Sequence, residues 1–212
     1  PSVTFPRVLG IECVGVIEAT SDSQRFTPGQ RVVSIMGEMG RDFDGSYAEY
    51  VLLPNQQIYP IKTDLPWEQL ATVPESYYTA YGAYKNLKLK ASDRILVRAG
   101  ASGVALAFFN LVKSSLPKAS VTASLRNPAK KAKLLASGYD QVIIEREGIL
   151  ETSQTFDKIL DLVGSSLNSG NAQIHACKSV KRTHCGSTSG CASESSMARS
   201  MVSVQRKPIG IP

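Results

Sequence analysis

The sequence predicts an α/β fold in which a doubly wound parallel sheet follows a smaller β-rich piece. In the first 60 residues, short strand-like runs are separated by turn residues, as in a small barrel or rolled sheet. From Trp67 onward, apolar strand-like runs alternate with helical patterns, which is typical of a parallel sheet with crossover helices. A glycine-rich turn joins one of these strands to the next helix, the setting of a dinucleotide-binding turn.

Strand-like runs in the β-rich piece are Val8–Ala19, Arg31–Val33 and Gly45–Leu53, with Pro54-Asn55 ending the last. The second part of the chain predicts helices at Leu70–Leu89, Val104–Lys113 and Pro128–Ser137, and strands at Arg94–Val97, Ser120–Ser124, Gln141–Ile144 and Lys158–Val163. After Gly164 the pattern decays, and no element is predicted there. That end is a flexible tail, a linker or a divergent end.

Composition restricts the class of protein. The chain has 212 residues, 42% of them hydrophobic, which fits one or two globular domains. The weakly polar stretch Ala99–Val112 is shorter than the roughly 18 to 20 apolar residues of a membrane span. Pro1–Arg7 lacks the charged and apolar regions of a signal peptide. Four cysteines do not resemble a secreted disulfide framework, so we expect a reducing, cytoplasmic location.

The formal net charge is +6, which suggests an anionic partner. A phosphorylated cofactor satisfies this charge, and no nucleic-acid-binding motif accompanies it. The helix Leu70–Leu89 carries Ala71, Tyr78, Ala80 and Ala83 as predicted packing residues. Its tyrosines at positions 77, 78, 81 and 84 could also form a stacking platform for bases, but helical spacing favours packing, with Tyr78 and Tyr81 on one face.

The glycine-rich turn carries the chemistry. Gly100 allows a tight turn, and small side chains at Ser102 and Gly103 allow backbone N–H groups to approach a pyrophosphate. Ala105 allows close packing of the following helix. Ser102 and Ala105 replace two glycines of the strict pattern, and an ordinary glycine-rich turn is the alternative interpretation. The spacing of the turn does not fit the GxSxG turn of a hydrolase.

The end of the next strand predicts which dinucleotide binds. An acidic residue there would pair with a ribose 2′-hydroxyl, but the sequence has Ser124, Leu125 and Arg126. Arg126 with nearby Lys130 and Lys131 could neutralise a 2′-phosphate. NADP(H) is therefore preferred over NAD(H). Alternatively, Lys130 and its neighbouring lysines form only a solvated helix face.

Several ordered segments resemble medium-chain dehydrogenases/reductases, in particular their zinc-independent quinone oxidoreductase and enoyl reductase-like branch. These segments are VLGIECVGVIEA, GSYAEY, PESYYTAYGAY, RAGASGVALA and FDKILDLVGSS, and the resemblance covers about Phe5 to Gly164. It implies a partial GroES-like β-barrel domain at 1–66, a Rossmann NADP-binding domain at 67–182 and a divergent or flexible tail at 183–212. Family members usually extend further at both ends, so we expect truncation at both ends. No segment in 183–212 matches the family's return to the catalytic domain.

The resemblance also implies site residues. Tyr47 and Thr79 are the predicted catalytic residues, with Tyr47 close to a cleft between the domains and Thr79 on the nicotinamide side. Ser102, Gly103 and Val104 would face the pyrophosphate, and Arg126 and Lys130 the 2′-phosphate. The full predicted cofactor set is Thr79, Gly100, Ser102, Gly103, Val104, Ser124, Arg126, Lys130 and Val163.

No metal site is predicted. The zinc alcohol dehydrogenase branch has a GHE segment that supplies a metal ligand where this chain has Gly10-Ile11-Glu12, and a second ligand, a cysteine, at about the position of Glu75. The lobe with the structural zinc cysteines of that branch is absent between Val33 and Gly45. Zinc sites need thiolate and imidazole ligands. A second cluster of zinc-type residues lacks a recognised ligand spacing. It consists of His175, Cys177, His184, Cys185 and Cys191.

The resemblance therefore implies an NADPH-dependent oxidoreductase that transfers hydride to an activated enone, enoyl thioester or quinone without zinc. The alternative is a catalytically impaired NADP(H)-binding scaffold or pseudoenzyme derived from such a reductase, and a third possibility is an unstable fragment. The expected partner is a small-molecule substrate. A homodimer remains open, because dimers are the commonest soluble assembly.

Overall fold

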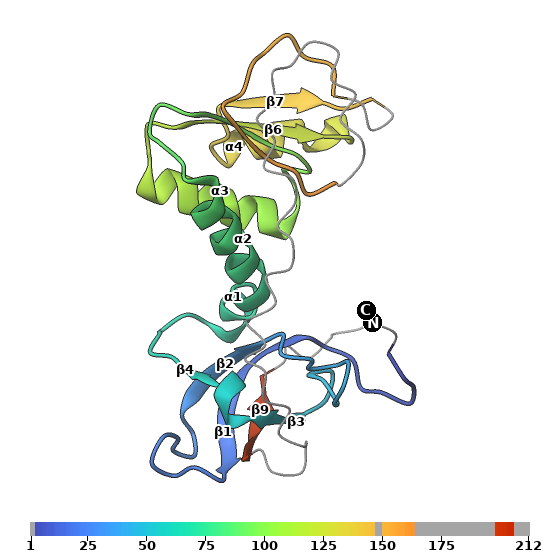
Figure 1. Cartoon of the computed structure of the whole chain (residues 1–212), viewed down its shortest axis with the longest axis vertical. Helices are drawn as coiled ribbons and strands as arrows, with labels where there is room; N and C mark the ends of the chain where they lie inside the picture. Colours follow the sequence, from blue (N-terminus) through green and yellow to red (C-terminus); the bar gives the residue numbers. More distant parts are fainter. Residues whose placement is uncertain (1–2, 147–149, 164–197, 206–212) are drawn as a thin grey trace. The chain divides into compact units, whose positions relative to one another are not determined.

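The computed structural model describes residues 3–146, 150–163 and 198–205. The chain divides into two compact units, which we call the β unit (Pro1–Glu75 with Ser187–Pro212) and the α/β unit (Ser76–Gly186). Each unit has its own sheet (Figure 1). Within the described residues, no helix is long and apolar enough to cross a membrane.

The β unit contains a five-stranded antiparallel sheet in the order β3-β9-β1-β2-β4. Its strands are β1 (Glu12–Thr20), β2 (Arg31–Ile35), β3 (Tyr50–Pro54), β4 (Tyr59–Pro60) and β9 (Arg199–Val204), with a 3₁₀ turn η1 (Asn55–Gln57) before β4. Alternate residues of the strands face a core that is closed by residues from the connecting segments. The core contains Cys13, Ile17, Phe26, Val32, Met39, Val51, Leu53, Ile58 and Val202.

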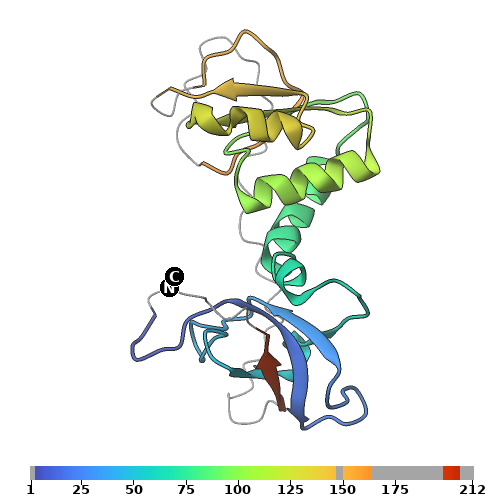
Figure 2. The ribbon, with the colours of Figure 1, turned by 180° about the vertical axis from the view of Figure 1, so that it is seen from behind.

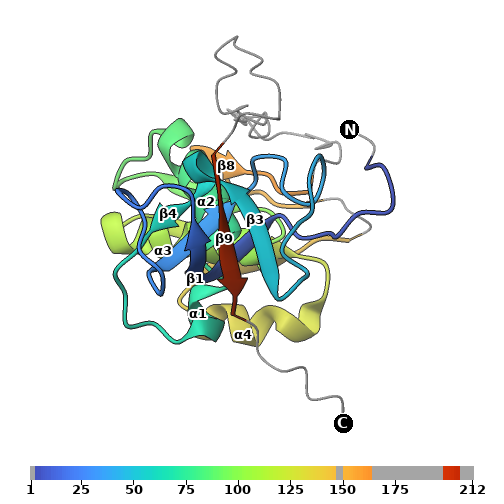
Figure 3. The same ribbon diagram turned by 90° about the horizontal axis from the view of Figure 1, so that it is seen from below.

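Strand β9 was not expected from the sequence. It lies between β1 and β3 and pairs with both, from Gly15 opposite Val204 to Pro54 opposite Arg199 (Figure 3). A Cβ atom on Gly15 would overlap the carbonyl oxygen of Ser203, so the absence of a side chain allows the two backbones to approach. Part of the expected tail therefore belongs to the sheet of the β unit.

The first predicted strand is shorter than expected. β1 begins at Glu12, because Gly10 adopts a φ of 110° that a continuous strand does not allow. The segment before it instead pairs with the GSYAEY segment, through the Gly45 N–H to the Val8 carbonyl (2.8 Å) and the Tyr47 N–H to the Leu9 carbonyl (2.9 Å). Only the second half of the predicted strand at 45–53 forms β3.

The α/β unit contains a four-stranded parallel sheet in the order β7-β6-β5-β8. The strands are β5 (Arg94–Val97), β6 (Ser120–Leu125), β7 (Gln141–Ile144) and β8 (Lys158–Leu160). Crossover elements α3 (Gly103–Ser115), η2 (Pro128–Lys130) and α4 (Lys131–Ala136) connect the first three. All four predicted strands are confirmed, and the last ends three residues early.

Both faces of this sheet are packed. Ile95 and Val97 of β5 face a core that includes Phe108 of α3 and Leu134 of α4, whereas Leu96 faces the opposite side with Ile159 and Phe156. This alternation is the two-residue period of a strand. Figure 2 shows α4 lying against the sheet, and its contact with β7 agrees.

The predicted helix at 70–89 is two helices. α1 (Trp67–Leu70) and α2 (Pro74–Leu87) are separated because proline disfavours the helical conformation in the residue before it. The prediction of the packing face was partly wrong: Ala80 and Ala83 are buried, but Ala71, Tyr78 and Tyr81 are exposed. Tyr77 and Tyr84 pack against the core instead, and Tyr77 accepts a hydrogen bond from the Asn110 amide at 3.0 Å.

Candidate dinucleotide site

The candidate site lies at the carboxyl edge of the parallel sheet. The chain passes from β5 to β6 and β7 on one side, and then returns to β8 on the other side of β5. The topological switch point therefore lies between β5 and β8. In open parallel sheets, ligands bind outside the carboxyl ends of the strands at this point.

The turn after β5 is shaped by two adjacent residues. Ala99 has a φ of 56°, a left-handed conformation that costs a non-glycine residue roughly 1–2 kcal/mol. Gly100 needs no positive φ but has no room for a side chain, because a Cβ atom there would lie 2.5 Å from the Cβ of Ala123 in β6. The positive φ of this turn thus falls on Ala99, and Gly100 allows close packing on β6.

The turn leads into the N-terminus of α3. Ser102 is the N-cap, and its hydroxyl accepts a hydrogen bond from the Ala105 N–H at 3.3 Å. Gly103 is exposed and Val104 is half-buried, and the first N–H groups of a helix have no acceptor within it. These N–H groups, together with the helix dipole, favour an anion such as a pyrophosphate.

A cationic surface follows β6. Arg126 and Lys130 are both exposed. They flank Asn127, whose side chain accepts a hydrogen bond from the Ala129 N–H at 2.9 Å and caps η2. The cap fixes the backbone between two flexible cationic side chains. This arrangement suits a phosphate close to the end of β6.

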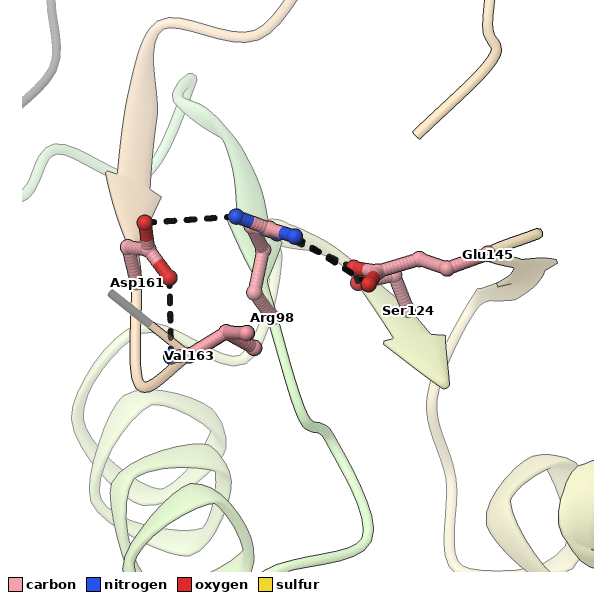
Figure 4. Close-up of polar contacts among 5 residues, drawn as sticks. All are labelled: Arg98, Ser124, Glu145, Asp161 and Val163. Carbon is pink, nitrogen blue, oxygen red and sulfur yellow. Dashed lines mark hydrogen bonds and ion pairs between the residues drawn. The ribbon is translucent and has the colours of Figure 1, made fainter. Parts of the chain in front are cut away.

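Ser124 is placed differently from the exposed cations. It is buried within β6, and its hydroxyl donates a hydrogen bond to Glu145 at 2.5 Å. Glu145 also receives two hydrogen bonds from the guanidinium of Arg98, at 3.0 and 3.1 Å, and Asp161 receives a third at 3.3 Å (Figure 4). The carboxylate of Asp161 accepts the Val163 N–H at 2.9 Å. We call Arg98, Ser124, Glu145 and Asp161 the Arg98 cluster.

Arg98 and Glu145 favour their charged forms in the folded protein. Hydrogen bonding to Glu145 raises the pKa of Arg98 above its ordinary value, although burial opposes this. Burial alone would raise the pKa of Glu145, but hydrogen bonds from Arg98 and Ser124 outweigh it and lower the pKa. The two partners thus stabilise each other's charged forms. Sequence reasoning missed the cluster, apart from Ser124.

The remaining predicted residues belong to different units. Tyr47 in the β unit has 73% of its surface exposed. Thr79 is half-buried on α2, and Val163 in the α/β unit is exposed. The α/β unit therefore brings together the turn, Ser124, Arg126, Lys130 and Val163 along one edge of its sheet.

Comparison with known proteins agrees with this architecture. The model of the alcohol dehydrogenase GroES-like domain matches residues 1–63. Human quinone oxidoreductase is 30% identical over 162 residues, which are 76% of this chain and 46% of that protein. The structure of quinone oxidoreductase from Coxiella burnetii aligns with a TM-score of 0.66 at 30% identity, over 76% of this chain and 50% of that one.

The chain belongs to the medium-chain dehydrogenase/reductase superfamily. It lies on the quinone oxidoreductase-like branch. Compactin diketide synthase of Penicillium citrinum, 32% identical over 130 residues, matches 59% of this chain and 5% of its own length. The chain spans about half the length of the quinone oxidoreductases that it matches.

Glu12 and Glu75 belong to the two segments in which zinc ligands were expected to be missing. Here, a carboxylate oxygen of Glu12 accepts the backbone N–H of Glu75 at 2.8 Å, close to the start of α2. Burial raises the pKa of Glu12. Within the described residues, no group of three or more potential ligands could hold a metal ion. The histidines and cysteines between residues 175 and 191 lie outside the described residues.

Proposed function

We propose that this chain provides the nucleotide-binding and substrate-facing parts of an NADPH-dependent oxidoreductase that reduces an activated enone, enoyl thioester or quinone without zinc. The observation that carries the proposal is the β5–turn–α3–β6 unit of the α/β unit, with an exposed helix N-terminus at Gly103 and a cationic surface after β6. Relatives described as a quinone oxidoreductase and as a polyketide-type synthase support this substrate class.

The residues present fit a phosphorylated dinucleotide. Gly103 has no side chain to cover the N-terminus of α3, and the Ser102 hydroxyl is engaged with the Ala105 N–H. The N–H groups of Gly103 and Val104 would therefore hold the pyrophosphate. Arg126 and Lys130 would hold the 2′-phosphate through charge-assisted hydrogen bonds.

Glu145 does not oppose this assignment. A carboxylate near a phosphate would weaken binding by like-charge repulsion, but Glu145 is buried against the Arg98 guanidinium. Its charge is thus compensated within the protein. The exposed charges at the end of β6, Arg126 and Lys130, are positive.

When bound, NADPH supplies the hydride. The protein must orient the nicotinamide and stabilise the oxyanion that develops on the substrate. We assign these tasks to Thr79 and Tyr47, respectively. The half-buried Thr79 side chain on α2 suits an orienting role, and the exposed phenol of Tyr47 suits a hydrogen-bond donor to a substrate oxygen.

The test is NADPH oxidation in the presence of small enones and quinones, followed by the loss of nicotinamide absorbance. We expect substrate-dependent oxidation above the protein-free rate. Arg126→Ala should raise the KM for NADPH about tenfold, the equivalent of about 1.4 kcal/mol, with little effect on NADH. Lys133→Ala also removes one positive charge, from the exposed face of α4, and should leave the KM values for NADPH and NADH unchanged.

Two results would contradict the proposal in different ways. NADPH binding without oxidation of any enone or quinone would support a non-catalytic NADP(H)-binding protein. Equal losses in Arg126→Ala and Lys133→Ala would mean that the cationic surface acts only through its overall charge.

A further inference from the structure

We propose that Asp161, anchored by Arg98, is a positioning residue that sets the shape of the switch point for the dinucleotide. This inference rests on the proposed function, because it concerns how the same site is held. It assigns a role to the ion pair of Arg98 with Asp161, two residues from separate segments of the sequence. The argument starts from where the four members of the Arg98 cluster lie.

Each member of the Arg98 cluster comes from the carboxyl end of a different strand. Arg98 directly follows β5, Glu145 directly follows β7 and Asp161 directly follows β8, while Ser124 is the penultimate residue of β6. One guanidinium thus links the ends of β5, β7 and β8 directly, and β6 through Glu145 (Figure 4). The Arg98 cluster spans the edge at which this fold binds ligands.

The two sides of the guanidinium have different surroundings. The side chains of Arg98 and Glu145 are 0% and 2% exposed, whereas that of Asp161 is 17% exposed. The Glu145 side is therefore a buried ion pair, whose disruption would leave an uncompensated buried charge and strongly destabilise the fold. The Asp161 side reaches the surface of the edge, between β5 and β8.

Asp161 also links Arg98 to the backbone of the chain that follows β8. One carboxylate oxygen contacts Arg98 and the other accepts the Val163 N–H. The backbone of the same strands is joined by a hydrogen bond from the Arg98 N–H to the Leu160 carbonyl at 2.9 Å. The turn at Val163 is thus fixed relative to β5, which leads into the phosphate-binding turn.

A purely stabilising ion pair is the competing explanation, and the molecule contains a matched control for it. Arg94 begins β5, and its guanidinium contacts Asp157, the residue before β8, at 3.1 and 3.3 Å. This pair joins the same two strands at their amino ends, away from the switch point. If the pairs only stabilise the sheet, removing either acid should have similar consequences.

The experiment compares Asp161→Ala with Asp157→Ala in the full 212-residue chain, measuring the dissociation constant of NADPH by calorimetry and Tm without nucleotide. We expect both variants to lower Tm slightly, and only Asp161→Ala to weaken NADPH binding, by about tenfold. Asp161→Asn keeps an oxygen for the Val163 N–H but loses the acceptor facing Arg98. Asp161→Asn should lose most of the NADPH affinity that Asp161→Ala loses. It tests the proposal even if Asp161→Ala does not fold.

The possible results separate the two proposals. Normal NADPH affinity in both Asp161 variants, or an equal loss in Asp157→Ala, would overturn the positioning role and leave the proposed function intact. No measurable NADPH binding by the unmodified chain would overturn the proposed function, and the positioning role with it.

Discussion

Ala99 shows how a single residue departs from the ideal turn. It adopts a φ of 56° at the start of the phosphate-binding turn, where glycine would be free of the steric cost. Its neighbour Gly100 has no positive φ and instead allows close contact with Ala123 of β6. A substitution of Ala99 by glycine can therefore relieve this strain.

We predict that Ala99→Gly stabilises the α/β unit. Relief of the left-handed strain, partly offset by the greater freedom of glycine in the unfolded chain, should raise the free energy of unfolding by about 0.5–1 kcal/mol. The measurement is thermal unfolding followed by circular dichroism, with an expected rise in Tm of a few degrees. Ala101→Gly, two positions along, is the control and should not raise Tm. A lower Tm in Ala99→Gly would show that the turn is not strained.

Glu12 gives a prediction about pH. Burial is the largest cause of its raised pKa, and Glu75 adds a like charge. The folded state therefore binds the Glu12 proton more tightly than the unfolded chain does. The resulting stabilisation is present at low pH and is lost as the pH rises from the ordinary value of 4.5 through the higher folded pKa.

Glu12→Gln should remove this dependence. Relative to the unmodified chain, the variant should gain Tm as the pH rises above the ordinary value of 4.5, because glutamine can still accept the Glu75 N–H and carries no charge. Glu18→Gln, exposed on the same strand, is the control. A Tm difference that does not change with pH would contradict the prediction.

At the scale of elements, local pattern predicted the parallel strands but not β9. β5 and β7 were predicted with their observed ends, because each is a short apolar run between polar turns. β9 has the sequence RSMVSV, and its buried surface depends on β1 and β3, from which more than 140 residues separate it along the chain. Such pairing is set by tertiary contacts and leaves no periodic signal in a six-residue segment.

The same distinction applies to the candidate site. Ser102 and Gly103 could be identified from a local motif, since their roles depend on the neighbouring backbone. Gly100 belongs to the same motif, but its contact with Ala123 depends on the sheet. Arg98 could not be paired with its partners, because Glu145 and Asp161 lie 47 and 63 residues away along the chain. Only the order of strands in the sheet brings these charges to one edge.

A substitution in β9 tests its place in the sheet. Val202 is fully buried in the core of the β unit, so Val202→Ala should lower the free energy of unfolding by about 1.5–3 kcal/mol through lost burial and a residual cavity. Trp67, the only tryptophan, belongs to the β unit and reports its urea unfolding by fluorescence. Met201→Ala, at a half-buried position outside that core, should have a smaller effect. Equal effects would contradict the pairing.

At the scale of the whole molecule, the predicted nucleotide contacts, from Thr79 to Val163, all belong to the α/β unit. The +6 formal charge of the chain favours an anionic ligand in general. Among the residues that the structure describes, the carboxyl edge of the parallel sheet combines a helix N-terminus, a close-packed glycine turn and exposed cations. Nucleotide binding should therefore stabilise this unit by mass action.

Thermal unfolding of the full chain with NADPH, NADH or neither tests the central claim most directly. At about 100 times its dissociation constant, NADPH should add about 2.7 kcal/mol to the stability of the state that binds it, and raise Tm by about 5–10 °C. NADH at the same concentration should raise Tm less, because it lacks the phosphate that Arg126 and Lys130 would hold. An unchanged Tm with both nucleotides would contradict the assignment of this edge as a dinucleotide site.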